Sequence, residues 1–390
     1  MGPSCPSSSS SPSPSTCPVH LELPDQPSQT ASIPHPQATK VEELWFEDGG
    51  VIIQAGLSLY RVSRGILAAR SNVFKHMFQS CVVPRPIPCA CPSSGSTSEL
   101  AYDGLNTQTK QDVTEMVDGV PFLKLLDDER DVTEFLKAVF DSSYFEPDPC
   151  GKPSIAAVIG ILRLSHKYDI GYLRKRALNY LNQGYPNTLA RWDMHNRGEL
   201  AVGYERVHDE LLEAYIVIQL ALETQADWLI PAAMYKCCTY PIENILALES
   251  AITQAGFNAP YFTAVTAATG ISAAQQLCLT TWPKIRASYH TLYGHLRTSA
   301  CTDWPRCQTR LSDKTAVYSR VASAWDTMND PLDSLDSKYW SSLKRDLCRN
   351  CCMESTRFYE KWRKDLWAEL PKLMGLKEWE VLNKMAEEQP

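Results

Sequence analysis

The sequence predicts an α+β domain, built from a small mixed sheet packed with helices, followed by a mostly α-helical C-terminal domain. Within residues 44–78 the apolar pattern changes from short, glycine-punctuated strands to amphipathic helices. Beyond them, apolar residues recur three and four positions apart, as they do on one face of a helix. At 390 residues and 44% apolar content, the chain can bury two cores of ordinary size. We therefore expect one domain over residues 44–185 and a second over residues 186–390.

Two segments rich in proline and serine are predicted to be disordered. The first is a tail over residues 1–43, and the second is a loop inserted into the first domain at about residues 80–117. Such segments hold few large apolar side chains, so they bury too little surface to offset the loss of chain entropy on folding. We interpret the insertion as a species-specific addition, with phosphorylation of its serines as the alternative.

The first domain opens with strands and a helical hairpin. Ile53, Leu57, Leu59 and Val62 lie among three glycines, Gly49, Gly50 and Gly56, which is typical of short, half-buried strands in a tight meander. A short helix is expected around residues 64–70, and Ser71 is the predicted N-cap of a second helix. The apolar face of this second helix comprises Val73, Phe74, Met77 and Phe78.

The order of these residues resembles the BTB/POZ domain, in the versions found in many fungal proteins of unassigned role. The resemblance covers about a third of the chain and implies a domain that binds other proteins. The chain departs from the family pattern at Ser63, where the family usually has histidine, and in its long insertion. The residues that carry the resemblance are Trp45, Phe46, Asp48, Gly49, residues 60–64, Leu67, Ala68, Ser71, Phe74, and residues 118–121.

Amphipathic helices are predicted through the rest of the chain. An acidic start at Asp127, Asp128 and Glu129 opens the first of them, because negative charge stabilises a helix N-terminus. Residues 165–169 are the expected turn between the next two helices, and Tyr185-Pro186 is the predicted domain boundary, since proline disfavours helix in the residue before it. The apolar faces are Val132, Phe135, Leu136, Val139 and Phe140; Ile155, Val158, Ile159 and Leu162; Ile170, Leu173, Ala177 and Leu181; Leu211, Tyr215, Ile218 and Leu222; and Trp362, Leu366 and Leu370. The predicted core of the first domain comprises Val62, Leu67, Phe74, Phe78, Leu125, Phe135, Leu136 and Leu162.

Composition and motifs argue against catalysis, direct nucleic-acid binding and membrane insertion. The net charge is −7 and the only basic cluster spans residues 174–176, so a surface that neutralises phosphates is not evident. No apolar run approaches the ~20 residues that span a bilayer. Glycine-rich phosphate loops, His-Glu-x-x-His and Gly-x-Ser-x-Gly motifs are absent from the sequence. The absence of these catalytic motifs leads us to expect a non-enzymatic protein. Because the N-terminus shows no secretory signal pattern, we expect it to be intracellular, either cytoplasmic or nuclear.

Four cysteines near the C-terminus are candidate ligands of a structural zinc ion: Cys301, Cys307, Cys348 and Cys351. Thiolates are the soft ligands that zinc prefers, and two pairs of close cysteines can complete one tetrahedral site. The five residues between Cys301 and Cys307 exceed the usual two to four. The alternative is that cysteines act as small apolar core residues, as we expect for Cys237, Cys238 and Cys278. No other cofactor is expected.

Two short elements are candidate protein contacts. The resemblance implies that two copies of the chain pair through the helical hairpin, where Ile66, Val73 and Met77 are the candidate contact residues. Residues 1–40 show no strand pattern, so we expect this dimer to form without a swapped N-terminal strand. Tyr144, Phe145 and Glu146 are similar to the hydrophobic-x-Glu element with which some BTB proteins bind cullin scaffolds. The sequence thus favours a homodimerising protein-interaction scaffold. The alternatives are a substrate adaptor for a cullin-type ubiquitin ligase and a zinc-stabilised transcriptional regulatory protein.

Overall fold

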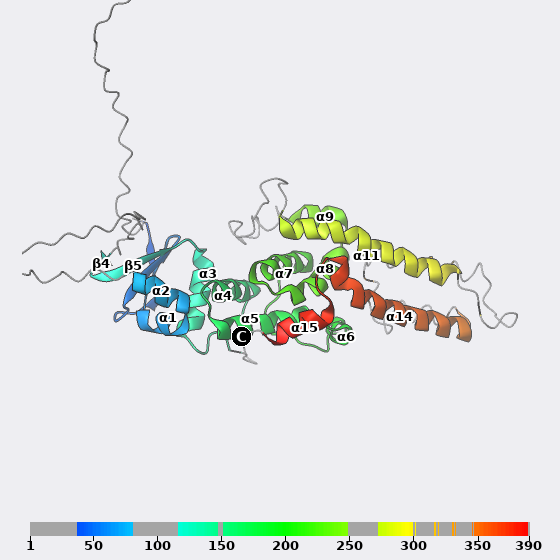
Figure 1. Cartoon of the computed structure of the whole chain (residues 1–390), viewed down its shortest axis with the longest axis horizontal. Coiled ribbons are helices and arrows are strands. Elements are labelled where there is room, and N and C mark those ends of the chain that lie inside the picture. Colours follow the sequence, from blue (N-terminus) through cyan, green and yellow to red (C-terminus); the bar gives the residue numbers. More distant parts are fainter. Residues whose placement is uncertain are drawn as a thin grey trace, which may run out of the picture.

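The computed structural model describes residues 37–80, 116–146, 151–248, 272–298 and 347–388, and the single residues 301, 316, 319, 330, 332 and 345. A small sheet with its helices lies at one end of an elongated molecule, and helices form the rest of the described chain (Figure 1). The predicted α+β class, with a small mixed sheet followed by mostly helical structure, is confirmed.

The five-stranded sheet has the order β1-β3-β2-β5-β4. Strands β2 (Val51–Ala55) and β3 (Ser58–Val62) form an antiparallel hairpin. Strand β5 (Val120–Leu125) runs parallel to β2, and β1 (Thr39–Trp45) runs parallel to β3. The short strand β4 (Met116–Val117) pairs antiparallel with β5. The sheet is therefore mixed, as predicted.

Strands β1 and β4 show that both segments predicted to be disordered were drawn too long. Residues 39–43, assigned to the tail, belong to β1, in which Thr39 and Lys40 pair with β3, and the backbone N–H of Thr39 donates to the Leu57 carbonyl at 2.8 Å. Only Leu44 of this edge strand is well buried, and three of its seven residues are charged, so its apolar alternation is weak. Met116 and Val117, assigned to the insertion, form β4, and residue 80 ends a helix. Residues 1–36 and 81–115 lie outside the described residues.

Tight backbone geometry explains two of the glycines in the first domain. In the β4–β5 turn, Asp118 and Gly119 have φ angles of 52° and 77°, the left-handed pair that a two-residue type I′ hairpin requires. A β-carbon at Gly49 would lie 2.8 Å from the backbone carbon of Arg61, closer than real side chains approach. At Gly49, therefore, only glycine fits beside β3.

Helices α1 (Arg64–Arg70) and α2 (Asn72–Ser80) meet at Ser71, which is buried. The Ser71 hydroxyl accepts a hydrogen bond from the Phe74 backbone N–H at 3.0 Å, so its predicted capping role is confirmed. The same hydroxyl donates to the Tyr168 carbonyl, far along the chain. Ser63 caps α1 by accepting from the Ile66 N–H at 3.4 Å.

Three predicted helices follow the sheet: α3 (Glu129–Phe140), α4 (Ile155–Lys167) and α5 (Gly171–Gly184). Helix α4 continues to Lys167, so the turn before α5 is shorter than the expected residues 165–169. The ring of Phe74 stacks on that of Tyr168, with 4.4 Å between ring centroids. The eight predicted core side chains are all buried: Val62, Leu67, Phe74, Phe78, Leu125, Phe135, Leu136 and Leu162.

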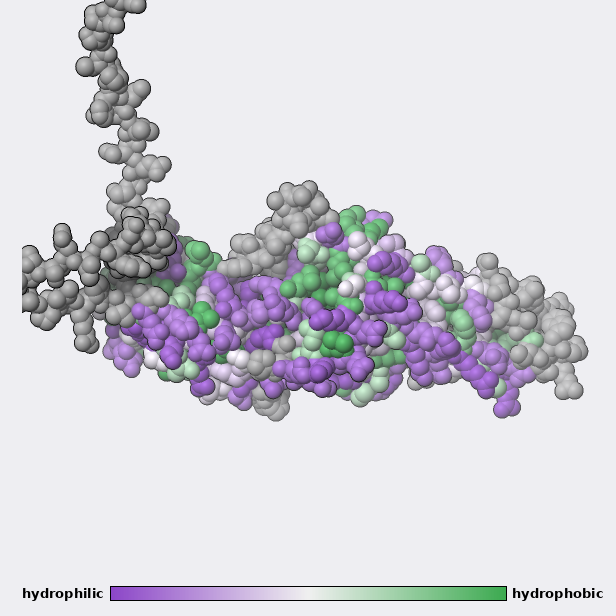
Figure 2. All heavy atoms as spheres, in the orientation of Figure 1, coloured by the Kyte–Doolittle hydropathy of each residue, from purple (hydrophilic) through white to green (hydrophobic). Residues whose placement is uncertain are grey.

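The C-terminal half of the described chain is helical and packs around α7, which is buried along almost its whole length. Figure 2 shows apolar residues gathered around α7 and α9, whereas α14 presents a mainly hydrophilic surface on this face. The elements are α6 (Leu189–Asn196), α7 (Glu210–Thr224), the 3-10 helix η1 (Asp227–Leu229), α8 (Ile230–Cys238), α9 (Ile242–Leu246), α11 (Ala273–Thr298), α14 (Arg349–Leu373) and α15 (Trp379–Glu387).

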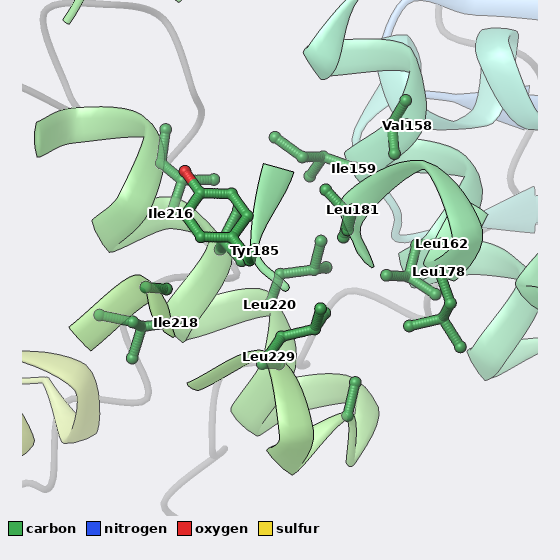
Figure 3. Close-up of a cluster of buried hydrophobic side chains, with 14 of the residues drawn as sticks. Val158, Ile159, Leu162, Leu178, Leu181, Tyr185, Ile216, Ile218, Leu220 and Leu229 are labelled. Atoms are coloured by element: carbon green, nitrogen blue, oxygen red, sulfur yellow. The ribbon is translucent and has the colours of Figure 1, made fainter. Parts of the chain in front are cut away.

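One cluster of buried apolar side chains runs from Leu44 in the sheet to Leu382 in α15. Figure 3 shows its middle, where side chains of α4, α5 and α7 point toward one another. Tyr185, at the predicted domain boundary, is itself buried in this cluster. The predicted C-terminal stripe of Trp362, Leu366 and Leu370 is buried here, as are the core cysteines Cys237, Cys238 and Cys278. Burial raises the pKa of the Cys237 and Cys238 thiols, which keeps them protonated.

We expect Phe74→Ala to lower the free energy of unfolding by about 3–5 kcal/mol, because it removes a buried ring and leaves a cavity. Phe46→Ala is the matched control, since the Phe46 ring is 37% exposed, and it should cost less than about 1 kcal/mol. Urea denaturation of the full chain, followed by tryptophan fluorescence, measures both. Equal small losses in the two variants would contradict the assignment of Phe74 to the core.

Candidate functional site

Helices α11 and α14 form an antiparallel pair that extends away from the sheet (Figure 1). The Lys284 ammonium donates to the Leu373 carbonyl at 2.8 Å. Further along, Tyr289 meets Trp362 edge to face, and the His295 ring stacks on Phe358 with 3.5 Å between centroids. From the first of these contacts to the last, the residue in α11 lies closer to the C-terminus of α11, and its partner lies closer to the N-terminus of α14. The C-terminal end of α11 is therefore brought to the N-terminal end of α14.

Three of the four predicted zinc ligands meet at this end of the helix pair. Cys301 follows α11, Cys348 is the N-cap of α14, and Cys351 lies in the first turn of α14. The sulfur atoms of Cys301 and Cys348 are 3.8 Å apart, and all three sulfurs lie within 4.8 Å of one another. Cys351 is buried, whereas the other two are partly exposed. The fourth predicted ligand, Cys307, lies outside the described residues.

This group of three thiols has two chemical uses, soft-metal binding and disulfide formation. The 3.8 Å between the Cys301 and Cys348 sulfurs is a non-bonded distance, since a disulfide bond is about 2.05 Å long. The backbone N–H of Cys351 donates to the Cys348 sulfur at 3.4 Å, at the positive end of a 25-residue helix. A helix N-terminus stabilises negative charge, so this position favours the thiolate that binds metal.

The three predicted dimer residues differ in exposure. Ile66 on α1 is 42% exposed, while Val73 and Met77 on α2 are partly buried against the core. Beside them, Arg64 folds back onto α2, where its guanidinium donates to the Phe78 carbonyl at 2.6 Å. Ile66 is therefore the most accessible apolar side chain of the three.

The fold buries one residue of the predicted cullin contact, residues 144–146, and leaves the other two at the surface. Phe145 is buried against Tyr180, with 5.1 Å between ring centroids, so its prediction as a surface contact is wrong in this conformation. Tyr144 is 37% exposed and Glu146 pairs with Arg176 at 2.9 Å. Burial and the Glu134 carboxylate, which accepts from the Tyr144 hydroxyl, raise the pKa of Tyr144. Sequence could not place Phe145, because an aromatic residue in a turn can face either way.

The structure also contains a buried carboxylate that the sequence reasoning missed. Glu213 of α7 is completely buried and accepts hydrogen bonds from the hydroxyls of Tyr185 and Tyr204, the Arg206 guanidinium and the Val207 N–H, at 3.0–3.1 Å. Burial, together with the charge of Glu213, raises the pKa of both tyrosines. The signal that could have found it is a single acidic residue within the otherwise apolar run 211–218. Four donors satisfy this carboxylate, so it serves the packing of the helices.

No family model, curated protein or solved structure matches this chain. Within the described part of the chain, no helix is both long and apolar enough to cross a membrane.

We expect Phe145→Ala to lower the free energy of unfolding by about 3–5 kcal/mol, because the buried ring anchors the turn to α5. Tyr144→Ala, the neighbouring control, should cost less than Phe145→Ala, because Tyr144 is 37% exposed whereas Phe145 is fully buried. Thermal unfolding of the full chain, followed by circular dichroism, gives the comparison. A larger loss for Tyr144→Ala than for Phe145→Ala would reverse the assignment.

Proposed function

We propose that the chain is a non-enzymatic protein-interaction scaffold of BTB/POZ type, which pairs with a second copy of itself through α1 and α2. The observation that carries the proposal is the order of elements after β1. A strand hairpin, two short helices, a strand parallel to the first strand of the hairpin, and three further helices follow one another. This order of elements supports the proposal that the first domain is of BTB/POZ type.

Three of the residues that carry the resemblance have a clear physical task in this arrangement. Gly49 lets the turn before β2 approach the backbone of Arg61, and the left-handed turn at Gly119 joins β4 to β5. Ser71 joins α1 to α2 and also binds the segment between α4 and α5. These residues specify a scaffold that holds α1 and α2 in a fixed position, and none of them forms a reactive centre.

The pairing surface is centred on Ile66, the accessible apolar side chain of α1. A two-fold contact brings the same residue of both copies together, so one apolar side chain contributes twice. Strand β1 pairs with β3 of its own chain and is additionally held by Glu43, whose carboxylate lies 2.6 Å from the Lys137 ammonium. A dimer made by the helices alone is small, and we expect it to be weak.

Light scattering of the full chain across a concentration series tests the pairing. We expect the mass to rise toward that of two chains at high micromolar concentration. Ile66→Glu should raise the dissociation constant at least about tenfold, which corresponds to about 1.4 kcal/mol, because it buries like charges against each other. Val381→Glu on α15 is the control, because Val381 is 43% exposed and lies on a different element. A strictly monomeric wild-type chain at these concentrations contradicts the proposal.

A substrate adaptor for a cullin-type ubiquitin ligase is a second candidate, which the exposed turn after α3 favours. The buried Phe145 anchors this turn and leaves Tyr144 and Glu146 at the surface. We expect a cullin scaffold to co-purify with the tagged wild-type chain and to be lost from the Tyr144→Ala, Glu146→Ala double variant. Binding that survives in the double variant, or none in the wild type, removes the adaptor role. The third alternative is a zinc-stabilised transcriptional regulatory protein. The three cysteines can support metal binding but say nothing about transcription, so a transcriptional role is not proposed.

A further inference from the structure

We propose that Cys301, Cys348 and Cys351 bind one Zn(II) ion through their three sulfurs, at the junction of α11 and α14. The proposal is independent of the pairing through α1 and α2, because the cysteines belong to other elements of the chain. Cys307, the fourth ligand predicted from the sequence, lies outside the described residues, so the proposal rests on the three described thiols.

The distances between the sulfurs suit a tetrahedral zinc centre. Zinc–thiolate bonds of about 2.3 Å place neighbouring sulfurs about 3.8 Å apart in a tetrahedron. The Cys301 and Cys348 sulfurs are already separated by 3.8 Å. Because all three sulfurs lie within 4.8 Å of one another, no pair has to close by more than about 1 Å.

The local sequence and backbone also fit a zinc site. Two residues separate Cys348 from Cys351, which is the short spacing that structural zinc sites use. The Cys351 backbone N–H already donates to the Cys348 sulfur, and this kind of bond orients a ligand and stabilises its charge. Cys301 and Cys348 are partly exposed, so an ion can reach the group from solvent.

Zinc binding is coupled to the release of protons from the thiols. Each thiol releases its proton to solvent, so three protons leave and the ion with its three thiolates carries a net charge of −1. The positive end of α14 faces this charge, and Arg349 is the first residue of that helix. The three described thiols supply three of the four positions of a tetrahedral site.

The zinc centre holds the end of the helix pair together. It joins Cys301 to Cys348, which are far apart in the sequence, and closing a long segment in this way removes conformational freedom from the unfolded chain. Lys284, Tyr289 and His295 hold the rest of α11 against α14. The cysteines continue this series of contacts beyond the last turn of α11.

The test uses the full chain, purified with a phosphine reductant and without chelator, and Zn(II) alone as the probe. We expect elemental mass spectrometry to find one zinc ion per chain. The metal-free protein titrated with Co(II) should develop thiolate-to-cobalt charge-transfer absorption and the strong ligand-field bands of tetrahedral coordination. Added Zn(II) should abolish both.

Cys348→Ser is the informative variant, because serine is a strong N-cap and preserves the start of α14 while removing the sulfur. We expect it to lose zinc affinity at least tenfold while its circular dichroism is unchanged. Cys352→Ser is the matched control, one residue beyond Cys351 and outside the group of three, and it should retain zinc.

Several outcomes would overturn the assignment. A wild-type chain that binds no zinc at stoichiometric concentration would do so, as would a Cys348→Ser variant that binds it as tightly as wild type. A Cys301–Cys348 disulfide found by mass spectrometry in metal-free protein isolated without reductant would replace the metal site by a redox pair.

Discussion

The fold depends on the burial of α4, which lies against α3, α5 and α7 at once. Residues 157–165 of this helix are all buried, so it has no face left for solvent. Its contact with α3 is close because of Gly160, where a β-carbon would lie 2.9 Å from the α-carbon of Asp131. Helix α4 thereby connects the sheet and its helices to the helical C-terminal half through one continuous core.

Burying a whole helix also buries its polar side chains, and these are paired. Arg163 of α4 bonds the carboxylates of Asp131 on α3 and Glu223 on α7, the latter through two oxygens at 3.0 Å. Breaking a buried pair by removing one partner typically costs about 3–5 kcal/mol, because the other charge stays buried. Arg163 therefore fixes which helices can lie beside α4. Glu213 does the same for the segments around α7.

The sites for which functions are proposed lie at the two ends of this core. Helix α1 presents Ile66 beside the sheet, and the three cysteines lie at the far end of α11 and α14 (Figure 1). Each site is carried by helices that the core holds in place, so its geometry is set before any partner or ion arrives. This arrangement is consistent with the scaffold proposed above, because it separates the two binding surfaces.

The sequence by itself determined the elements with strong periodicity: the β2–β3 hairpin, α1 to α5, α7, and the core side chains such as Phe74. It also indicated the close pair Cys348 and Cys351, because their spacing is local. Only the tertiary structure decided that β1 is a strand, that Phe145 is buried, and that Cys301 meets the pair. The physical reason is that periodicity records which face of its own element a residue occupies. Contacts between residues distant in sequence depend instead on how the elements pack, which no local pattern contains.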